Sequence, residues 1–332
     1  MGRRKRNLSS LNGRLELSLR IISFNVENLF VSPQATNFQE ADNKLPRVIQ
    51  PGDKDFPLTQ LLAKSIKEMS PDILGLMEVG GQESLEAFNE IYLNNSYYPS
   101  LIPGNSDRNI HLGYLINKKL PYDFEHYTHR NRSFYPKDSK KEDYLSRDIA
   151  ELRLFNKEDD KKERPLLIVL TVHLKSKRSD GQDFGGQKKR AAEFKLLLET
   201  YIHLEKRFKS EVPIVIMGDF NAVIHHEYGG PGFQKLFDDT DLTDILEILK
   251  YPFDERATQT SFSRKGEVIA QQFDYIFLSK KWHSLVNKST SGLYLFRDKN
   301  NQVIRRPQSS FERAQLPSDH YPLICDLELT KI

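Results

Sequence analysis

The chain has 332 residues, of which 38% are hydrophobic and 29% charged, and its 49 basic side chains nearly balance 46 acidic ones. This composition is typical of a globular protein with its own core, and it excludes a collagen-like, disulfide-rich or wholly disordered chain. The net charge of +3 does not by itself indicate a nucleic-acid-binding protein, although a local basic surface would be enough to bind phosphates.

The N-terminal residues and the cysteine content bear on where the protein is located. Basic residues 3–6 are followed by a polar segment, which is unlike a secretory signal peptide. The single cysteine, Cys325, excludes an internal disulfide and fits a reducing compartment, and no apolar run is long enough to span a membrane. We therefore expect a cytoplasmic protein with a flexible basic arm at residues 1–18, a single folded domain at 19–332 and no obligate protein partner.

Apolar runs that end at turn signals predict strands along the chain. They lie at 19–24, 73–77, 113–116, 150–155, 166–174, 214–217, 273–278 and 322–327. Helical periodicity lies between them, at 58–70, 84–93, 187–206, 233–239 and 243–249. Residues 31–57 read as a long loop and the charged run 157–164 as a solvated hairpin. Mixed strands and helices without repeats indicate a layered α/β domain.

Short polar motifs follow apolar runs at seven places and supply carboxylates, amides and two imidazoles. This mixture can hold a hard cation, polarise a phosphate and move a proton. The motifs are Phe24-Asn25-Val26-Glu27-Asn28, Gly75-Leu76-Met77-Glu78, Asp107-Arg108-Asn109, Thr171-Val172-His173-Leu174-Lys175-Ser176, Gly218-Asp219-Phe220-Asn221, Phe273-Asp274-Tyr275-Ile276 and Ser318-Asp319-His320.

Two of these motifs place oxygen donors after predicted strands. Asn25 and Glu78 could meet at one sheet edge, where Mg²⁺ would need few protein oxygens because it keeps several waters. In isolation, capping the following loop would be the commoner role for a glutamate such as Glu78, whereas the full set of motifs favours a metal ligand. Asp219 and Asn221 are two positions apart and share one face of an extended segment. A carboxylate there can orient or deprotonate water, and the amide can donate to a phosphate oxygen.

Basic side chains near these motifs suit phosphate binding. Arg108 and Arg147 carry planar guanidinium groups that stay charged, and Lys175 adds a donor beside His173. The adjacent histidines His225 and His226 precede a glycine-rich segment, so we interpret them as a flexible loop rather than a metal site.

The order of the motifs resembles the endonuclease/exonuclease/phosphatase family, metal-dependent phosphoesterases that include pancreatic-type deoxyribonuclease and the exonuclease III-like abasic-site nucleases. The resemblance covers roughly residues 20–328. It implies a four-layer α/β sandwich, in which two packed mixed sheets are flanked by helices, and it implies Mg²⁺, or alternatively Mn²⁺, as the cofactor.

The resemblance also implies roles for the matching residues. Asn25, Glu78 and Asp319 would support the metal, and Glu78 would bind it directly. His320 would pair with Asp274, and such a pair could act as a general base or bind the scissile phosphate as an imidazolium.

A second pair, His173 with Asp107, is implied because deoxyribonuclease-like members place a histidine and an acid at these positions. This favours the deoxyribonuclease-like branch over the exonuclease III-like one. The sequence departs from the family pattern in the segment around Asp107. Many bacterial relatives have Asp-Arg-Arg-Gly-Ile where this chain has Asp107-Arg108-Asn109-Ile110, which puts the local turn and one phosphate contact in doubt.

These observations predict a divalent-metal-dependent phosphodiester hydrolase, a nuclease with two histidine–aspartate pairs that acts on DNA rather than RNA. The alternative is a phosphatase or phospholipid phosphodiesterase on the same scaffold. Inositol phosphatases carry a Trp-Cys-Asp-Arg segment, whereas the only tryptophan here, Trp282, lies in Lys281-Trp282-His283. A non-enzymatic binding module would show eroded catalytic positions, and nearly all of them are intact.

Overall fold

The computed structural model describes residues 10–11, 14–15, 18–32, 52–136, 140–159, 161–179, 183–227 and 231–329. Within the predicted arm, two short strands, β1 (Ser10–Leu11) and β2 (Arg14–Leu15), pair antiparallel. Apart from Ser18, the rest of that arm and most of the predicted loop 31–57 lie outside the described residues.

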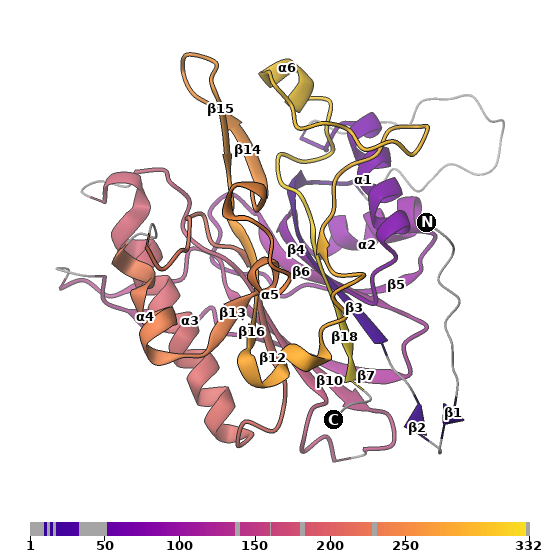
Figure 1. Ribbon diagram of the computed structural model, residues 1–332, viewed down its shortest axis with the longest axis vertical. Helices are drawn as coiled ribbons and strands as arrows, with labels where there is room; N and C mark the ends of the chain where they lie inside the picture. The colour runs from indigo at the N-terminus through magenta and orange to yellow at the C-terminus, as the bar shows by residue number, and fades with distance from the viewer. Residues whose placement is uncertain are drawn as a thin grey trace.

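Two six-stranded mixed sheets form the centre of the molecule (Figure 1). One sheet has the order β17 (Gly292–Leu293), β18 (Leu323–Glu328), β3 (Ser18–Leu29), β4 (Ile73–Val79), β6 (His111–Asn117) and β5 (Tyr97–Ser100). The other has the order β13 (Leu242–Asp244), β16 (Asp274–Ser279), β12 (Ile214–Asp219), β11 (Leu167–His173), β10 (Ile149–Asn156) and β7 (Tyr122–Thr128). Each sheet contains one parallel pair, β3 with β4 and β11 with β12.

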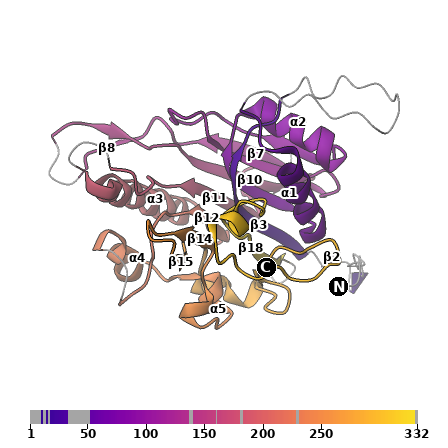
Figure 2. The same cartoon turned by 90° about the horizontal axis from the view of Figure 1, so that it is seen from above.

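Helices cover the outer faces of both sheets (Figure 2). Helices α1 (Phe56–Met69) and α2 (Gln82–Leu93) pack on one sheet, and α3 (Gln187–Arg207) packs on the other. The shorter elements are α4 (Gln234–Asp239), α5 (Ile245–Ile248), α6 (Ser310–Arg313), η2 (Phe184–Gly186), η3 (Pro231–Phe233), η4 (Phe253–Glu255), η5 (Lys280–Leu285), and the hairpins β8 (Ser133–Phe134) with β9 (Asp143–Tyr144) and β14 (Gln259–Phe262) with β15 (Val268–Gln271).

Consecutive apolar residues of the central strands enter different cores. In β11, Leu167 and Val169 join the cluster between the two sheets, whereas Ile168 and Leu170 join the cluster beneath α3. A third cluster lies between the other sheet and helices α1 and α2. Because side chains alternate between the two faces of a strand, a strand covered on both faces must be apolar throughout. The predicted four-layer α/β sandwich is therefore confirmed.

The structure departs from the predicted elements at one helix and several strands. Residues 243–249 do not form a single helix, because Thr243 belongs to β13 and pairs with Leu278 of β16, and α5 begins only at Ile245. Pairing with a neighbouring strand overrides the local helical periodicity here. The edge strands β5 and β7 mix polar and aromatic residues and are only partly buried, so they carried no apolar-run signal. Within the described ranges, no helix has the length and apolar character needed to cross a bilayer.

Candidate active site

The polar motifs meet where the parallel strands of both sheets end. His173 is the last residue of β11 and Asp219 the last of β12, and the two are direct neighbours in the parallel register. Since β16 runs antiparallel to β12, its first residue, Asp274, lies opposite Asp219. Asn25 and Glu78 lie toward the ends of β3 and β4 in the facing sheet. Sheet pairing thus gathers residues that are far apart in the sequence.

Gly218 sets the backbone immediately before Asp219. Its φ is +138°, and a Cβ atom at this position would lie 1.9 Å from the backbone oxygen of Val172. A residue with a side chain could not adopt this conformation against β11 without displacing the strand. The close backbone approach that requires a glycine here is therefore to the neighbouring strand β11.

Asp219 lies at the centre of the site and is only 2% exposed. Its Oδ2 atom accepts a hydrogen bond from Asn25 Nδ2 at 3.1 Å and lies 3.5 Å from His173 Nε2 and 3.8 Å from His320 Nε2. Its Oδ1 atom accepts the backbone N–H of Asn221 at 2.8 Å. Burial raises the pKa of Asp219 to about 7, although the charge on His320 opposes this rise.

His320 and Asp274 form the histidine–aspartate pair that the resemblance implied. Their Nδ1 and Oδ2 atoms are 2.7 Å apart, and both side chains are buried. Burial alone would lower the pKa of His320, but the carboxylates of Asp274, Asp319 and Asp219 outweigh it and raise that pKa well above its usual value. His320 is therefore an imidazolium at neutral pH, held by a carboxylate on one ring nitrogen and facing Asp219 with the other.

His173 does not form the predicted pair with Asp107. No hydrogen bond or ion pair joins these two residues in the described part of the chain, and His173 Nδ1 has no hydrogen-bond partner there. The Nε2 atom of His173 faces Asp219 and Glu78 instead, at 3.5 Å and 3.9 Å. Asp107 lies in an exposed turn, whereas His173 ends a central strand and is 3% exposed. Burial, together with the nearby Arg147, lowers the pKa of His173 well below its usual value, so this imidazole is neutral.

Oxygen donors gather on the β3 and β4 side of the site. Asn25 Nδ2 lies 3.4 Å from Glu78 Oε1, and Asn25 Oδ1 accepts the backbone N–H of Glu27 at 3.0 Å. The backbone N–H of Asp319 donates to Glu27 Oε2 at 3.1 Å. Carboxylate and amide oxygens of this kind are the ligands that Mg²⁺ and Mn²⁺ prefer, so the residues fit the cofactor implied by the resemblance.

A second group of possible metal ligands lies beside this one. One ligand atom each from Asp219, Asp274 and His320 falls within 4.8 Å of the others, and all three residues are buried, so the group could bind a metal ion. Within it, His320 Nδ1 already forms a short hydrogen bond with Asp274, which leaves less room for an ion between those two side chains.

The predicted phosphate ligands differ in how they are held. Arg147 is 6% exposed and donates to the backbone oxygen of Leu174 at 3.3 Å, while its Nε atom has no partner among the described residues. Arg108 is exposed and donates to Asn28 Oδ1 at 3.1 Å. Asn221 Nδ2 donates to the same Leu174 oxygen at 3.1 Å, and Lys175 follows as a half-buried residue.

Two residues that support the site were missed by the sequence analysis. The carboxylate of Glu193, on α3, is 1% exposed and accepts the backbone N–H groups of Ser146 and Lys175, both at 2.6 Å. It therefore joins the segments that carry Arg147 and Lys175. No local signal identified it, because it reads as one more charged residue of an amphipathic helix. The second residue is Thr258, which directly precedes β14.

Thr258 holds the carboxylate of Asp274 in place. Its hydroxyl donates to Asp274 Oδ2 at 2.7 Å and accepts the backbone N–H groups of Phe273 and Asp274 at 3.0 Å and 2.9 Å. We expect Thr258→Val, which removes the hydroxyl but keeps the shape, to lower kcat about tenfold by freeing Asp274, with KM little changed. Steady-state kinetics with a phosphoester that the protein hydrolyses measure both kcat and KM.

The matched control for this positioning role is Thr258→Ser, which keeps the hydroxyl and should restore most of the lost kcat. If Thr258 served only to stabilise the fold, the valine variant would have a lower melting temperature, and kcat would not fall selectively while KM stayed the same. Equal kcat for the valine and serine variants would contradict the positioning role.

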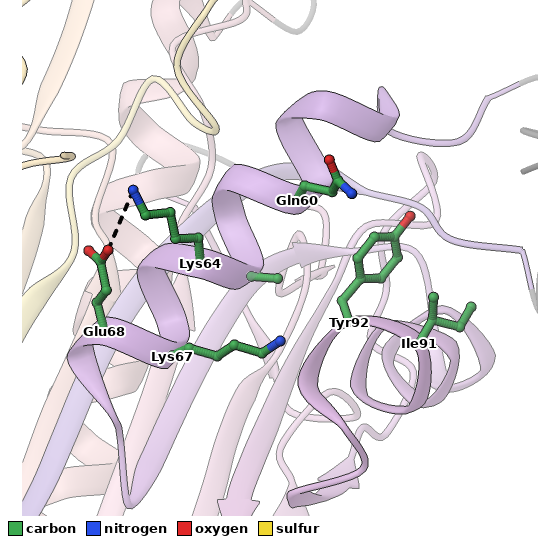
Figure 3. A pocket seen from close by; sticks show the side chains of 7 residues that line it. Gln60, Lys64, Lys67, Glu68, Ile91 and Tyr92 are labelled. Carbon is green, nitrogen blue, oxygen red and sulfur yellow. Dashed lines mark ion pairs between the residues drawn. The ribbon is translucent and has the colours of Figure 1, made fainter. Parts of the chain in front are cut away.

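A shallow cavity of about 570 Å³ lies away from this site, on the outer side of α1 and α2 (Figure 3). It is lined by Gln60, Ala63, Lys64, Lys67, Glu68, Ile91 and Tyr92. Lys64 and Glu68 form an ion pair at 3.6 Å across its edge. None of the residues singled out by the motifs contributes to this cavity.

Comparisons with known proteins give a clear answer at the level of the fold. No protein-family model matches the chain, and no curated protein does. The truncated TDP2 of Caenorhabditis elegans matches with a TM-score of 0.55 and 15% identity over 94% of this chain and 98% of that one. TDP2 from D. rerio, solved with a single-strand DNA product, matches with a TM-score of 0.52.

Two bacterial structures match equally well. An endonuclease/exonuclease/phosphatase family protein from Bacteroides thetaiotaomicron gives a TM-score of 0.53 and 17% identity over 94% of this chain and 98% of that one. The mannosyl-6-phosphatase Bt3783 of the same species gives 0.54 and 17%, over 93% and 99%. At these identities the likeness concerns the fold alone, and the chain therefore has the four-layer α/β sandwich fold of the endonuclease/exonuclease/phosphatase proteins.

Proposed function

We propose that this protein is a divalent-metal-dependent phosphodiester hydrolase that acts on DNA. The observation that carries the proposal is the convergence on Asp219. This buried carboxylate lies within 4 Å of two histidines, one of them paired with Asp274, and it adjoins the oxygen donors Asn25 and Glu78. A purely structural role would not require so many buried polar groups at one point, because burying them is costly.

The proposed division of roles follows from these positions. Asp219 orients and deprotonates the attacking water, because its carboxylate is central and burial raises its pKa to about 7, which lets it accept a proton near neutral pH. The His320 imidazolium, fixed by Asp274, binds a phosphate oxygen and stabilises the charge that builds up there. Asn221, Arg147 and Lys175 would donate to the remaining phosphate oxygens.

The metal ligands and His173 complete the proposed arrangement. Glu78, with Asn25 and Asp319, would hold the divalent cation, which when bound supplies Lewis-acid stabilisation to the phosphate. His173 is neutral and lies between Glu78 and Asp219, so it can accept or donate a hydrogen bond without adding charge. We assign it to orienting these carboxylates, in place of the pairing with Asp107.

DNA is favoured as the substrate because basic side chains continue beyond the reacting centre. Lys177 and Arg178 are exposed and lie two and three positions after Lys175. The ammonium group of Lys177 lies 4.2 Å from the ring centroid of Phe273 and 3.2 Å from Gln271 Oε1, so it is held beside the site. Such a row can bind the phosphates that flank a cleaved bond, which a small phosphate ester lacks.

A phosphatase activity is the second candidate, since the mannosyl-6-phosphatase matches the fold as well as TDP2 does. The test is hydrolysis of supercoiled plasmid, labelled linear duplex DNA, single-stranded RNA, mannose 6-phosphate and sphingomyelin, each with Mg²⁺, with Mn²⁺ and with chelator. Metal-dependent DNA cleavage is the expected result. Phosphate release from the sugar phosphate without DNA cleavage would support the phosphatase, and no hydrolysis of any substrate would overturn the proposal.

A further inference from the structure

An aromatic side chain is almost fully exposed beside the segment that carries Lys175. Phe184, the first residue of η2, is 85% exposed, more than any other large hydrophobic residue in the described part of the chain. Single exposed hydrophobic residues are common on protein surfaces and do not by themselves indicate a ligand. In Phe184, the way the loop is held and the charges around it point to one.

A buried arginine fastens the loop of Phe184 to the segment that follows β11. The guanidinium group of Arg190, which is 6% exposed, donates to the backbone oxygen of Lys175 at 2.9 Å and to that of Gly185 at 3.1 Å. The backbone N–H of Gly185 also donates to Ser179 Oγ at 3.0 Å. The residue next to Phe184 is therefore tied to both ends of the basic segment 175–179.

The same loop packs closely against the backbone of that segment. Gly186 has a φ of +62°, and a Cβ atom there would lie 2.5 Å from the backbone oxygen of Ser176. Only a glycine allows this conformation and this approach without a shift of the neighbouring chain. The ring of Phe184 is thus exposed on a fixed backbone, close to the strand end that places His173 in the site.

The charges around Phe184 leave a positive surface. The exposed basic residues of the two flanking segments are Lys177, Arg178 and Lys188. The carboxylate of Asp183 accepts the backbone N–H groups of Lys188 and Lys189 at 2.9 Å and 3.0 Å, at the start of α3. Asp143 forms an ion pair with Lys189 at 2.9 Å. Because these acidic groups are engaged within the protein, the ring lies in a field that attracts polyanions.

An exposed aromatic ring among cations suits a ligand that is both anionic and aromatic. In single-stranded nucleic acids the bases stack on aromatic side chains while the phosphates contact lysine and arginine. In a duplex the bases are stacked and paired inside, and bringing one out costs a few kcal/mol. A lipid surface would meet the same charges, but its binding strength depends on the apolar area buried, and one ring provides little.

We propose that Phe184 is a stacking platform for an unpaired base of a single-stranded polynucleotide whose phosphates lie along Lys175 and Lys177. This inference rests on the proposed function, in which the substrate is DNA, and it adds the strandedness of that substrate and the place of one base. Because the ring contacts a base and not a phosphate, its contribution to affinity does not depend on counterion release.

The experiment measures the binding of a short fluorescein-labelled oligothymidylate by fluorescence anisotropy with Mg²⁺ present. Its linkages are phosphorothioates, which resist hydrolysis. Phe184→Ala should raise Kd about tenfold. Phe184→Tyr, which keeps a flat ring, should restore most of the affinity, whereas Phe184→Leu, which is apolar without a ring, should not. A blunt duplex of the same length should bind the unchanged protein and Phe184→Ala alike, because it offers no unpaired base.

The matched control is Tyr98→Ala, which removes another exposed aromatic side chain. Tyr98 pairs with Ile116 of β6, and Ile116 lies beside Ile73 at the start of β4, whereas Glu78 lies toward the end of that strand. Tyr98 is therefore at the opposite end of the sheet from the site, and its replacement should leave Kd unchanged. Circular dichroism melting confirms that each variant is folded.

Two further measurements separate stacking from attraction between charges. Phe184→Trp places an indole in the exposed position, and the oligothymidylate should quench its fluorescence, whereas the native Trp282, which is 7% exposed, should respond little. The slope of log Kd against log salt concentration should be the same in Phe184→Ala as in the unchanged protein. In Lys177→Ala that slope should fall by about one, because one phosphate contact is lost.

Equal Kd for the unchanged protein and Phe184→Ala, full recovery in Phe184→Leu, or no binding of the oligothymidylate at all would each overturn the inference. It would also fail if Phe184→Ala lost only binding to phosphatidylserine vesicles, which would assign the ring to a membrane. DNA cleavage with an unaffected Kd in Phe184→Ala would reject only the stacking role. Stacking at Phe184 without hydrolysis of any phosphoester would reject only the proposed function.

Discussion

Replacing His320 by alanine is expected to lower kcat about 10³-fold, because a positioned acid–base or charge-stabilising side chain contributes on that scale. His320 forms a 2.7 Å hydrogen bond with Asp274 and lies 3.8 Å from Asp219, so its loss removes the buried imidazolium that balances these carboxylates. The measurement is kcat at saturating Mg²⁺ on the best substrate of the panel.

The matched control is His203→Ala, because His203 is an exposed histidine of α3 far from the strand ends that form the site. It should keep wild-type kcat. If His320→Ala is folded, as judged by circular dichroism, and retains more than a tenth of wild-type kcat, His320 has no direct part in the reaction.

The Asp219→Asn variant is expected to lose activity on the same scale of about 10³-fold. The amide oxygen of an asparagine can still accept the backbone N–H of Asn221, but its NH2 group cannot replace the oxygen that accepts from Asn25 Nδ2, and the side chain can neither accept a proton from water nor carry negative charge. The loss should therefore appear in kcat, measured under the same saturating conditions. Asp238→Asn, an exposed change on α4, serves as the control for loss of one carboxylate.

The same variant should be more stable than the wild type above neutral pH. Burial raises the pKa of Asp219 to about 7, so the native state holds a proton that the unfolded state releases near its ordinary pKa. The stability contributed by that proton is present at low pH and is lost as the pH rises through about 7. In chelator, the melting temperature of Asp219→Asn relative to wild type should thus rise between pH 4 and pH 8. If the difference in melting temperature between the variant and the wild type stayed constant across this pH range, the pKa of Asp219 would not be raised in the native state.

The positions of the polar motifs could be predicted from local sequence because they lie at or near the ends of apolar strands. The runs before Asp219 and His173 are apolar at consecutive positions, as strands buried on both faces require, and both runs became central strands. The resemblance added the pairing of His320 with Asp274, which the structure brings to 2.7 Å. The helix 187–206 was predicted almost to the residue, since its apolar stripe is long and regular.

The partner of His173 could not be predicted in the same way. The pairing with Asp107 was carried over from the resemblance, and the segment around Asp107 is the one that departs from the pattern of bacterial relatives. In the structure that segment is an exposed turn, and the ring of His173 faces Asp219 and Glu78. The strand register of β11 against β12, which sets this contact, is a property of the sheet and not of either strand alone.

The sequence by itself determined most of the central strands and long helices, the layered α/β class and the kinds of side chain available for chemistry, because hydrophobic periodicity and turn residues act over a few neighbouring positions. Only the tertiary structure decided which of those side chains meet. Asn25 reaches Asp219 across 194 positions and Asp319 reaches Glu27 across 292. Such contacts depend on how two sheets and a short helix pack together, and Arg313, which no motif singled out, became part of the site for that reason.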